Sequence, residues 1–151
     1  MIQGLYAITP SGLEENDLLT KTEVLLKEGI KLIQYRDKNL DKKTLQEKAH
    51  TLLKLTKKYG AKLVINDHVE ICLEISADGF HLGLEDYSSE GNVDLLKKNK
   101  EFISKNLICG LSCKWNKELV VNPPENEIKW TYLAVGSFYP SNTKSTIPET
   151  N

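Results

Sequence analysis

The sequence predicts an α/β fold in which about six strands, each followed by a helix or a helical turn, form a parallel sheet. Three observations lead to this prediction. Short runs of apolar, β-forming residues alternate along the chain with stretches of helical periodicity. Most of these runs are too continuously apolar to have a wet face, which is typical of a parallel sheet covered on both sides. Alternation at this spacing favours right-handed βαβ units.

The predicted elements follow one another without a linker, a low-complexity segment or an exact repeat. The expected strands are Leu5–Ile8, Leu32–Tyr35, Leu63–Ile65, Gly79–Leu82, Leu107–Leu111 and Tyr132–Val135. The expected helices are Asp17–Lys27, Asp41–Lys58, Val69–Ile75, Val93–Lys98 and a weaker Lys114–Val121. Asp41 is a candidate N-cap, because its side chain can accept a hydrogen bond from the first turn. A turn-rich loop, Gly136–Lys144, follows the last strand.

Length and composition narrow the class of protein. With 151 residues, of which 40% are hydrophobic, the chain suits a single domain over 1–151. Charged residues reach 27% but balance to a net charge of −1, which argues against nucleic-acid or anionic-membrane partners. No apolar run approaches the roughly 18 residues of a membrane helix, and the start lacks a signal-peptide pattern. Cys72, Cys109 and Cys113 are expected to be reduced thiols of a cytoplasmic protein.

Polar residues gather where the predicted strands end, which is where ligands bind in parallel α/β folds. The second strand runs into Gln34-Tyr35-Arg36-Asp37-Lys38. Because side chains alternate along a strand, Gln34, Arg36 and Lys38 share one face, and Tyr35 points the other way. One amide and two cations on a face suit an anion. The alternative is a solvated strand end with surface salt bridges.

Two carboxylates follow neighbouring strands. The third strand runs into Asn66-Asp67-His68 and the fourth into His81-Leu82-Gly83-Leu84-Glu85-Asp86. Asp67 and Asp86 can share Mg²⁺, which binds through one or two carboxylates and takes other ligands from water and phosphates. The alternatives are that Asp67 caps the helix at Val69 and that Asp86 belongs to a turn or a cap before Tyr87-Ser88.

Other polar residues at the strand ends have weaker signals. His81, inside an apolar strand end, is interpreted as a packed, hydrogen-bonded core histidine, and His68 as a loop residue. Ser112 ends the fifth strand and is taken as a hydroxyl donor to a ligand, with Cys113 incidental. The loop that closes on Lys144 consists of small hydroxyl and amide residues, which suits phosphate or an ordinary surface loop.

At these positions the sequence resembles the thiamine-phosphate synthase family over nearly its whole length. The motifs that carry the resemblance are Leu5–Thr9, Gln34–Lys38, Asn66–His68, Ala77–Asp86, Gly110–Cys113 and Phe138–Lys144. The resemblance implies a (β/α)8 TIM-barrel fold and a transferase. The implied reaction joins 4-amino-2-methyl-5-hydroxymethylpyrimidine diphosphate to a thiazole phosphate and releases pyrophosphate. In the implied mechanism pyrophosphate leaves first, and the thiazole nitrogen attacks the resulting pyrimidinyl-methyl cation.

The resemblance also implies roles for individual residues. Those implied to bind the small phosphorylated substrates are Gln34, Tyr35, Arg36, Asp37, Lys38, Asn66, Ser112, Ser141, Asn142, Thr143 and Lys144. Arg36, Lys38 and Lys144 are implied to stabilise the leaving group and are the catalytic candidates. Asp67 and Asp86 are implied to hold Mg²⁺.

Length is the main departure from the family pattern. The chain accommodates about six of the eight β/α units, so we expect the seventh and eighth to be missing and the first and sixth strands to be open edges prone to self-association. Two alternatives stay open. One is a thiazole tautomerase, a related isomerase that has no diphosphate or Mg²⁺ to hold. The other is a non-catalytic remnant that binds the pyrimidine diphosphate.

Overall fold

The structure of the chain is a computed structural model that describes residues 4–124 and 128–136. The strands of this part are β1 (Tyr6–Ile8), β2 (Leu32–Tyr35), β3 (Lys62–Asn66), β4 (Gly79–Leu82), β5 (Ile108–Lys114) and β6 (Tyr132–Val135). Its helices are α1 (Glu15–Lys27), α2 (Lys42–Lys58), α3 (Val69–Ile75), α4 (Leu84–Tyr87), α5 (Glu90–Lys98), α6 (Lys100–Asn106) and α7 (Lys117–Val121).

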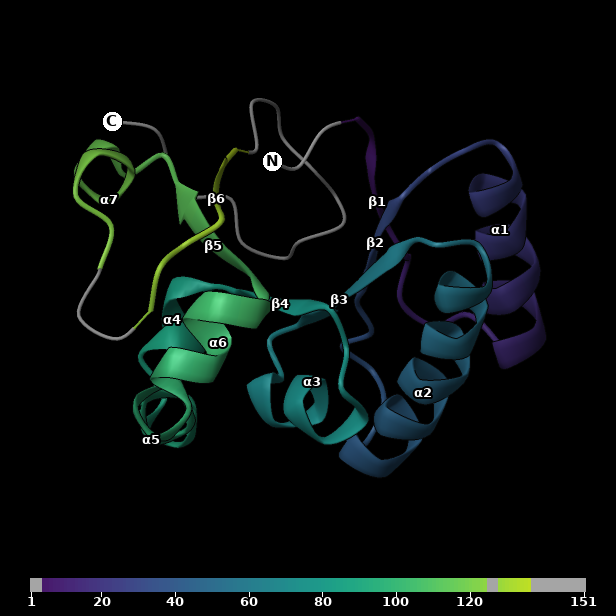
Figure 1. Ribbon diagram of the computed structural model, residues 1–151, viewed down its shortest axis with the longest axis horizontal. Helices are drawn as coiled ribbons and strands as arrows, with labels where there is room; N and C mark the ends of the chain where they lie inside the picture. Colours follow the sequence, from purple (N-terminus) through teal and green to yellow (C-terminus); the bar gives the residue numbers. More distant parts are fainter. Residues whose placement is uncertain (1–3, 125–127, 137–151) are drawn as a thin grey trace.

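All neighbouring strands in this sheet are parallel, and their order is β1-β2-β3-β4-β5-β6. A doubly wound sheet reverses its strand order at a switch point, whereas a barrel adds each strand beside the previous one. The helices α1, α2, α3, α5 and α6 lie along the outer side of the curved sheet (Figure 1). The described residues therefore form five successive β/α units and a sixth parallel strand of a TIM-barrel type, as predicted.

The two faces of the sheet differ because side chains alternate along each strand. The face toward the helices is apolar, and Ile33, Leu63, Ile65, Phe80 and Leu82 are all at most 1% exposed. These side chains join residues of α1, α2 and α3 in one hydrophobic core. The opposite face, which would be the barrel interior, carries the polar positions predicted above.

Most element boundaries agree with the sequence prediction. The strands Leu32–Tyr35, Gly79–Leu82 and Tyr132–Val135 and the helix Val69–Ile75 match to the residue. The predicted cap of α2 is confirmed, because the Asp41 side chain accepts a hydrogen bond from the Thr44 N–H at 3.0 Å.

Two short helices were missed. The single turn of α4 lies inside the predicted strand-end motif, and α6 is separated from α5 only by Asn99. Neither is long enough to show an apolar repeat. The short α4 matters for function, since it carries Asp86.

Other general expectations can be compared with the described residues. Cys72, Cys109 and Cys113 are free, as expected, and all three are buried. No helix in residues 4–124 or 128–136 is long and apolar enough to cross a membrane. Leu5 and Ile8, at the β1 edge, are 74% and 57% exposed. Self-association through such edges stays a prediction.

Candidate active site

Two hollows adjoin at the carboxyl ends of the strands. The first, here called the interior cavity, has a volume of about 850 Å³ and is lined by Tyr6, Ile8, Thr9, Pro10, Ser11, Gln34, Arg36, Asn66, His81, Ser112, Tyr132, Ala134, Val135 and Gly136. The second, the mouth pocket, has a volume of about 510 Å³ and is lined by Asp37, Lys38, Leu40, Asn66, Asp67, His68, Glu70, Asp86, Ser89, Gly91, Asn92 and Leu95.

Asn66, the last residue of β3, lines both hollows. The residues predicted to bind substrate divide between them. Gln34, Arg36 and Ser112 belong to the interior cavity, and Lys38 belongs to the mouth pocket. A molecule with a ring in the cavity and a charged tail in the mouth pocket would pass Asn66.

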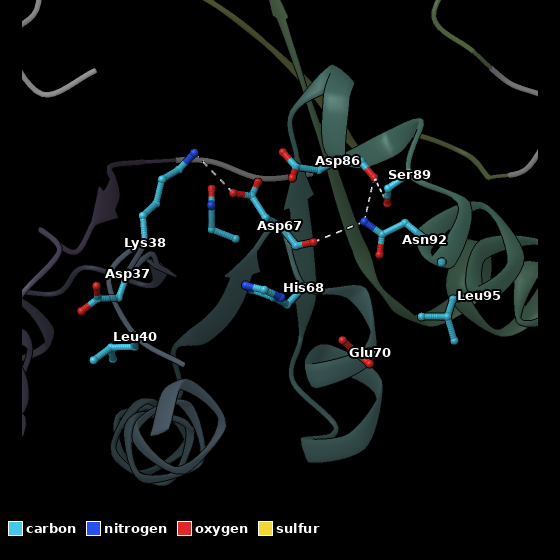
Figure 2. Close-up of a pocket in the computed structure, with 12 residues that line it drawn as sticks. Asp37, Lys38, Leu40, Asp67, His68, Glu70, Asp86, Ser89, Asn92 and Leu95 are labelled. Atoms are coloured by element: carbon cyan, nitrogen blue, oxygen red, sulfur yellow. Dashed lines mark hydrogen bonds and ion pairs between the residues drawn. The ribbon is translucent and has the colours of Figure 1, made fainter. Parts of the chain in front are cut away.

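The carboxylates of Asp67 and Asp86 face each other in the mouth pocket (Figure 2). The Asp67 side chain is 17% exposed and lies 3.8 Å from the Lys38 amine. Burial, and then repulsion and hydrogen bonding by Asp86, raise the pKa of the Asp67 carboxyl above its usual value, while the Lys38 charge opposes the shift. Two carboxyl groups this close together make a favourable place for a cation.

The backbone at Asp67 is held in an uncommon conformation. Its φ angle is +66°, in the left-handed region that non-glycine residues seldom adopt. The Asp67 N–H donates to the His81 carbonyl at 2.8 Å, which ties the end of β3 to β4. Residues held in this way cluster at functional sites. The alternative role for Asp67 is wrong, because His68 is the N-cap of α3 and no side chain caps that helix.

Two further residues shape the acidic pair. Gly83 leaves room for Asp86, since a Cβ at position 83 would lie 2.8 Å from the Asp86 carboxylate. The Asn92 side-chain amide donates to the Asp86 carbonyl at 2.7 Å and to the Asp67 carbonyl at 3.3 Å (Figure 2). One side chain from α5 thus holds the backbones of both acidic residues. Sequence reasoning missed Asn92, because the role depends on carbonyls that only the fold brings together.

The loop after β1 contacts Arg36 and Lys38, the two cationic residues that follow β2. The Arg36 N–H donates to the Thr9 hydroxyl at 3.0 Å, and the Arg36 guanidinium contacts the Ser11 hydroxyl at 3.4 Å. The Ser11 hydroxyl also accepts from the Lys38 N–H at 3.4 Å. Thr9 is only 8% exposed. This arrangement holds the Arg36–Lys38 segment in place between the two hollows.

The polar side chains deeper in the interior cavity are linked. The Gln34 amide nitrogen donates to the Tyr6 hydroxyl at 2.9 Å, and the Tyr6 and Tyr132 hydroxyls are 2.8 Å apart. The Tyr132 hydroxyl lies 2.9 Å from Nδ1 of His81, and the two rings stack with centroids 5.7 Å apart. Burial raises the pKa of both phenols. His81 is hydrogen-bonded, as predicted, but it lines the cavity.

For two residues of the predicted substrate-binding set, Tyr35 and Asp37, the structure shows contacts within the protein. Tyr35 is 2% exposed and packs in the helix-facing core, so it lies outside both hollows. Asp37 lines the mouth pocket, but its carboxylate accepts from the Gly12 N–H at 3.0 Å and the Asn39 N–H at 3.1 Å. Asp37 therefore orders the loops around the site.

The predicted phosphate loop cannot be placed in the same way. Ser141, Asn142, Thr143 and Lys144 lie outside the described residues. Their roles in binding, and that of Lys144 as a catalytic cation, stay predictions.

The residues present fit Mg²⁺ better than a metal that requires a full protein cage. In residues 4–124 and 128–136, no group of three or more His, Cys, Asp or Glu side chains is arranged to hold a metal. Mg²⁺ needs only one or two carboxylates when waters and phosphates complete its shell. The facing, partly buried pair of Asp67 and Asp86 satisfies that requirement.

Comparison with known proteins gives the family. The family model described as thiamine monophosphate synthase matches residues 5–150. The thiamine-phosphate synthase of Janthinobacterium sp. (strain Marseille) is 36% identical over 143 residues, which are 95% of this chain and 65% of the relative. The Nitrosospira multiformis thiamine-phosphate synthase is 35% identical over 148 residues, 97% of this chain and 59% of the relative. The chain thus spans less than two thirds of the length of these relatives.

A solved structure is similar over the same part of the chain. The thiamine phosphate pyrophosphorylase from Pyrococcus furiosus superposes with a TM-score of 0.67 at 28% sequence identity, covering 92% of this chain and 63% of that one. Sequence family, strand order and solved structure agree. The chain belongs to the thiamine monophosphate synthase family.

Proposed function

We propose that this chain carries the pyrimidine-diphosphate half of a thiamine-phosphate synthase site and that the protein catalyses formation of thiamine phosphate. The observation that supports this most is the junction at Asn66, where an interior cavity meets a charged mouth pocket. A pyrimidine ring bearing a diphosphate has matching parts. The named relatives are thiamine-phosphate synthases, which agrees with the proposal.

The residues that line the two hollows would contact different parts of the substrate. The ring would occupy the interior cavity near Gln34 and Ser112, and the diphosphate would extend past Asn66. Arg36 would approach the diphosphate from the cavity side and Lys38 from the mouth pocket. Both cations can make charge-assisted hydrogen bonds to phosphate oxygens, and Lys38 would do so beside Asp67, which lies 3.8 Å from its amine. Lys144 would add a third cation.

Asp67 and Asp86 would hold Mg²⁺, which when bound neutralises part of the charge on the leaving pyrophosphate. In the proposed reaction the bond between the methylene carbon and the diphosphate oxygen breaks, and the electron pair leaves with pyrophosphate. The thiazole nitrogen then forms the new C–N bond with its lone pair. Arg36 and Lys38 would stabilise the charge that develops on the leaving oxygen. The reaction requires no protein nucleophile.

The test is pyrophosphate release by the 151-residue chain with both substrates and Mg²⁺. We expect at most slow release, which depends on the thiazole phosphate and is lost in Arg36→Ala, while Lys54→Ala, an exposed cation on α2, retains it. Binding of the pyrimidine diphosphate without release would support a binding module. Isomerisation of a thiazole phosphate without diphosphate binding would support a tautomerase and contradict the proposal. Location in the cytoplasm stays a prediction.

A further inference from the structure

Four side chains from four strands form a continuous hydrogen-bonded chain across the interior cavity. Gln34 on β2 contacts Tyr6 on β1, Tyr6 contacts Tyr132 on β6, and Tyr132 contacts His81 on β4, with distances of 2.9, 2.8 and 2.9 Å. All four line the interior cavity. We call this group the phenol relay. Tyr6 and Tyr132 have no part in the function proposed above.

The position of Tyr132 depends on a neighbouring glycine. A Cβ on Gly110 would lie 2.2 Å from the Tyr132 ring and 2.7 Å from Nδ1 of His81. Gly110 pairs with both His81 and Tyr132 in the sheet, so its missing side chain provides the space in which the two rings stack. The Tyr6 ring meets Tyr132 edge-on, with centroids 5.6 Å apart. The hydroxyl groups are therefore held at their contacts by packing.

The hydrogens of the relay can be counted. The Gln34 amide nitrogen donates to the Tyr6 hydroxyl. The Tyr6 proton then goes to the Tyr132 oxygen, and the Tyr132 proton goes to Nδ1 of His81. If His81 donated from Nδ1 instead, either the Tyr6 proton or the Tyr132 proton would have no acceptor within the group, as long as the Gln34 amide keeps this orientation. Only the first direction uses every hydrogen of these contacts.

The direction of the relay determines what its two ends offer. With its amide nitrogen turned toward the Tyr6 hydroxyl, Gln34 presents its carbonyl oxygen to other partners. Because Nδ1 of His81 accepts from Tyr132, the neutral imidazole carries its proton on Nε2. The two ends are coupled, since turning the Gln34 amide would reverse the phenols and move the His81 proton to Nδ1.

We propose that Tyr6 and Tyr132 are positioning residues that fix Gln34 as a hydrogen-bond acceptor and His81 as the Nε2–H tautomer, so that the interior cavity selects a planar heteroaromatic ring with a complementary pattern. An aminopyrimidine has such a pattern, with an amino donor next to a ring-nitrogen acceptor. The ring selectivity rests on the proposed function, whereas the direction of the relay rests on the geometry alone.

The first arm of the test needs no substrate. Long-range ¹H–¹⁵N spectra of the imidazole rings, recorded at about pH 8 where histidine is ordinarily neutral, report which nitrogen carries the proton. The chain has three histidines, and loss of signals in His81→Gln assigns that ring. We expect His81 as a single Nε2–H tautomer whose Nδ1 accepts a hydrogen bond. Tyr132→Phe keeps the ring but removes the hydroxyl, so Nδ1 should lose that hydrogen bond.

A matched control removes a phenol elsewhere. Tyr59→Phe deletes a hydroxyl that donates to Glu23 at 2.6 Å on the helical surface, and it should leave the His81 signals unchanged. Observation of the Nδ1–H tautomer in the unaltered chain would overturn the relay. Unchanged His81 signals in Tyr132→Phe would also overturn it.

The second arm measures affinity by calorimetry with Mg²⁺ and two probes, the pyrimidine diphosphate and inorganic pyrophosphate. Tyr6→Phe and Tyr132→Phe should each weaken binding of the pyrimidine diphosphate about tenfold, as for loss of one hydrogen bond. Binding of pyrophosphate, which has no ring, should not change. Equal weakening of both probes would show a purely structural role and contradict the proposal. If the unaltered chain binds neither probe, the proposed function fails, and the imidazole spectra alone decide the relay.

Discussion

The two faces of the sheet use the same strands for different purposes. On β2, Ile33 is 1% exposed and packs against the helices, whereas Gln34, the next residue, lines the interior cavity. The same alternation places Ile65 in the core and Asn66 at the junction of the two hollows. The helix-facing side chains are apolar and close-packed, while the interior face adds polar, hydrogen-bonded side chains to apolar ones such as Val64.

Adjacent residues on one strand therefore have different roles: one stabilises the fold, and the next faces the ligand-binding side. Burial of apolar area on the helix-facing side stabilises the fold without reference to a ligand. The polar residues that follow the strands include two carboxyl groups that repel each other, Asp67 and Asp86. Substitutions on the two faces should therefore change different measured quantities.

The largest effect is expected on the helix-facing side. Ile33→Ala removes a buried side chain and leaves a cavity, which should lower the free energy of unfolding by about 2–5 kcal/mol. Urea unfolding followed by circular dichroism measures this quantity. The folded fraction should bind the pyrimidine diphosphate with unchanged affinity, because Ile33 faces away from the cavity. A loss of affinity in the folded variant would break the separation of the two faces.

On the other face, Arg36→Ala should reduce diphosphate affinity while leaving stability nearly unchanged. Loss of a charge-assisted contact should cost about 1.5–3 kcal/mol of binding free energy. Arg36→Lys should recover little of it if the contact is bidentate. We expect a similar loss for Lys144→Ala. Full affinity in both alanine variants would show that these cations are solvated surface groups, and Lys54→Ala is the matched control.

Asn92→Ala tests a residue that contacts the backbone of both acidic residues. Losing its hydrogen bonds to the carbonyls of Asp67 and Asp86 should cost about 1 kcal/mol of stability and weaken Mg²⁺-dependent binding severalfold. Asn106→Ala is a suitable control, since the Asn106 amide donates to the Phe102 carbonyl at 2.9 Å on the surface. Equal effects of the two variants on binding would remove any role of Asn92 in the site.

The smallest effect concerns pH. Because burial and Asp86 raise the pKa of Asp67, the unfolded chain loses this proton at a lower pH than the folded chain does. The stabilising contribution of Asp67 is therefore full below the unfolded pKa and is lost as the pH rises through the folded pKa. Asp67→Asn, which tolerates the positive φ, should lack this decline. Urea unfolding is measured from acid to neutral pH in the presence of a chelator. As the pH rises, the free energy of unfolding of Asp67→Asn should increase relative to that of the unaltered chain. Parallel curves of unfolding free energy against pH would contradict this.

Local patterns predicted most of the fold. The β2 run Leu32–Tyr35 is apolar enough to be identified by itself, and Asp41 precedes a long amphipathic helix with a clear cap position. The alternation along β2 also placed Gln34 and Arg36 on the ligand-facing side. Information of this kind is contained within a few neighbouring residues.

The remainder depends on contacts between distant parts of the chain. Tyr6 and Tyr132 meet across 126 residues, and neither has a local signal for that contact. Asn92 contacts two backbone carbonyls, which any residue could provide. Tyr35, although adjacent to the ligand-facing residues, belongs to the core because side chains alternate. The residues that support the site therefore required the structure.

In the proposed site, the acidic pair Asp67 and Asp86 holds Mg²⁺ for the diphosphate of a substrate whose pyrimidine ring enters the interior cavity. Calorimetry of the pyrimidine diphosphate against the 151-residue chain, with Mg²⁺ and then with excess chelator, tests this most directly. We expect binding that requires Mg²⁺ and that weakens sharply in Asp67→Asn and in Asp86→Asn. The same affinity with and without chelator would contradict the metal assignment and, with it, the proposed use of the mouth pocket.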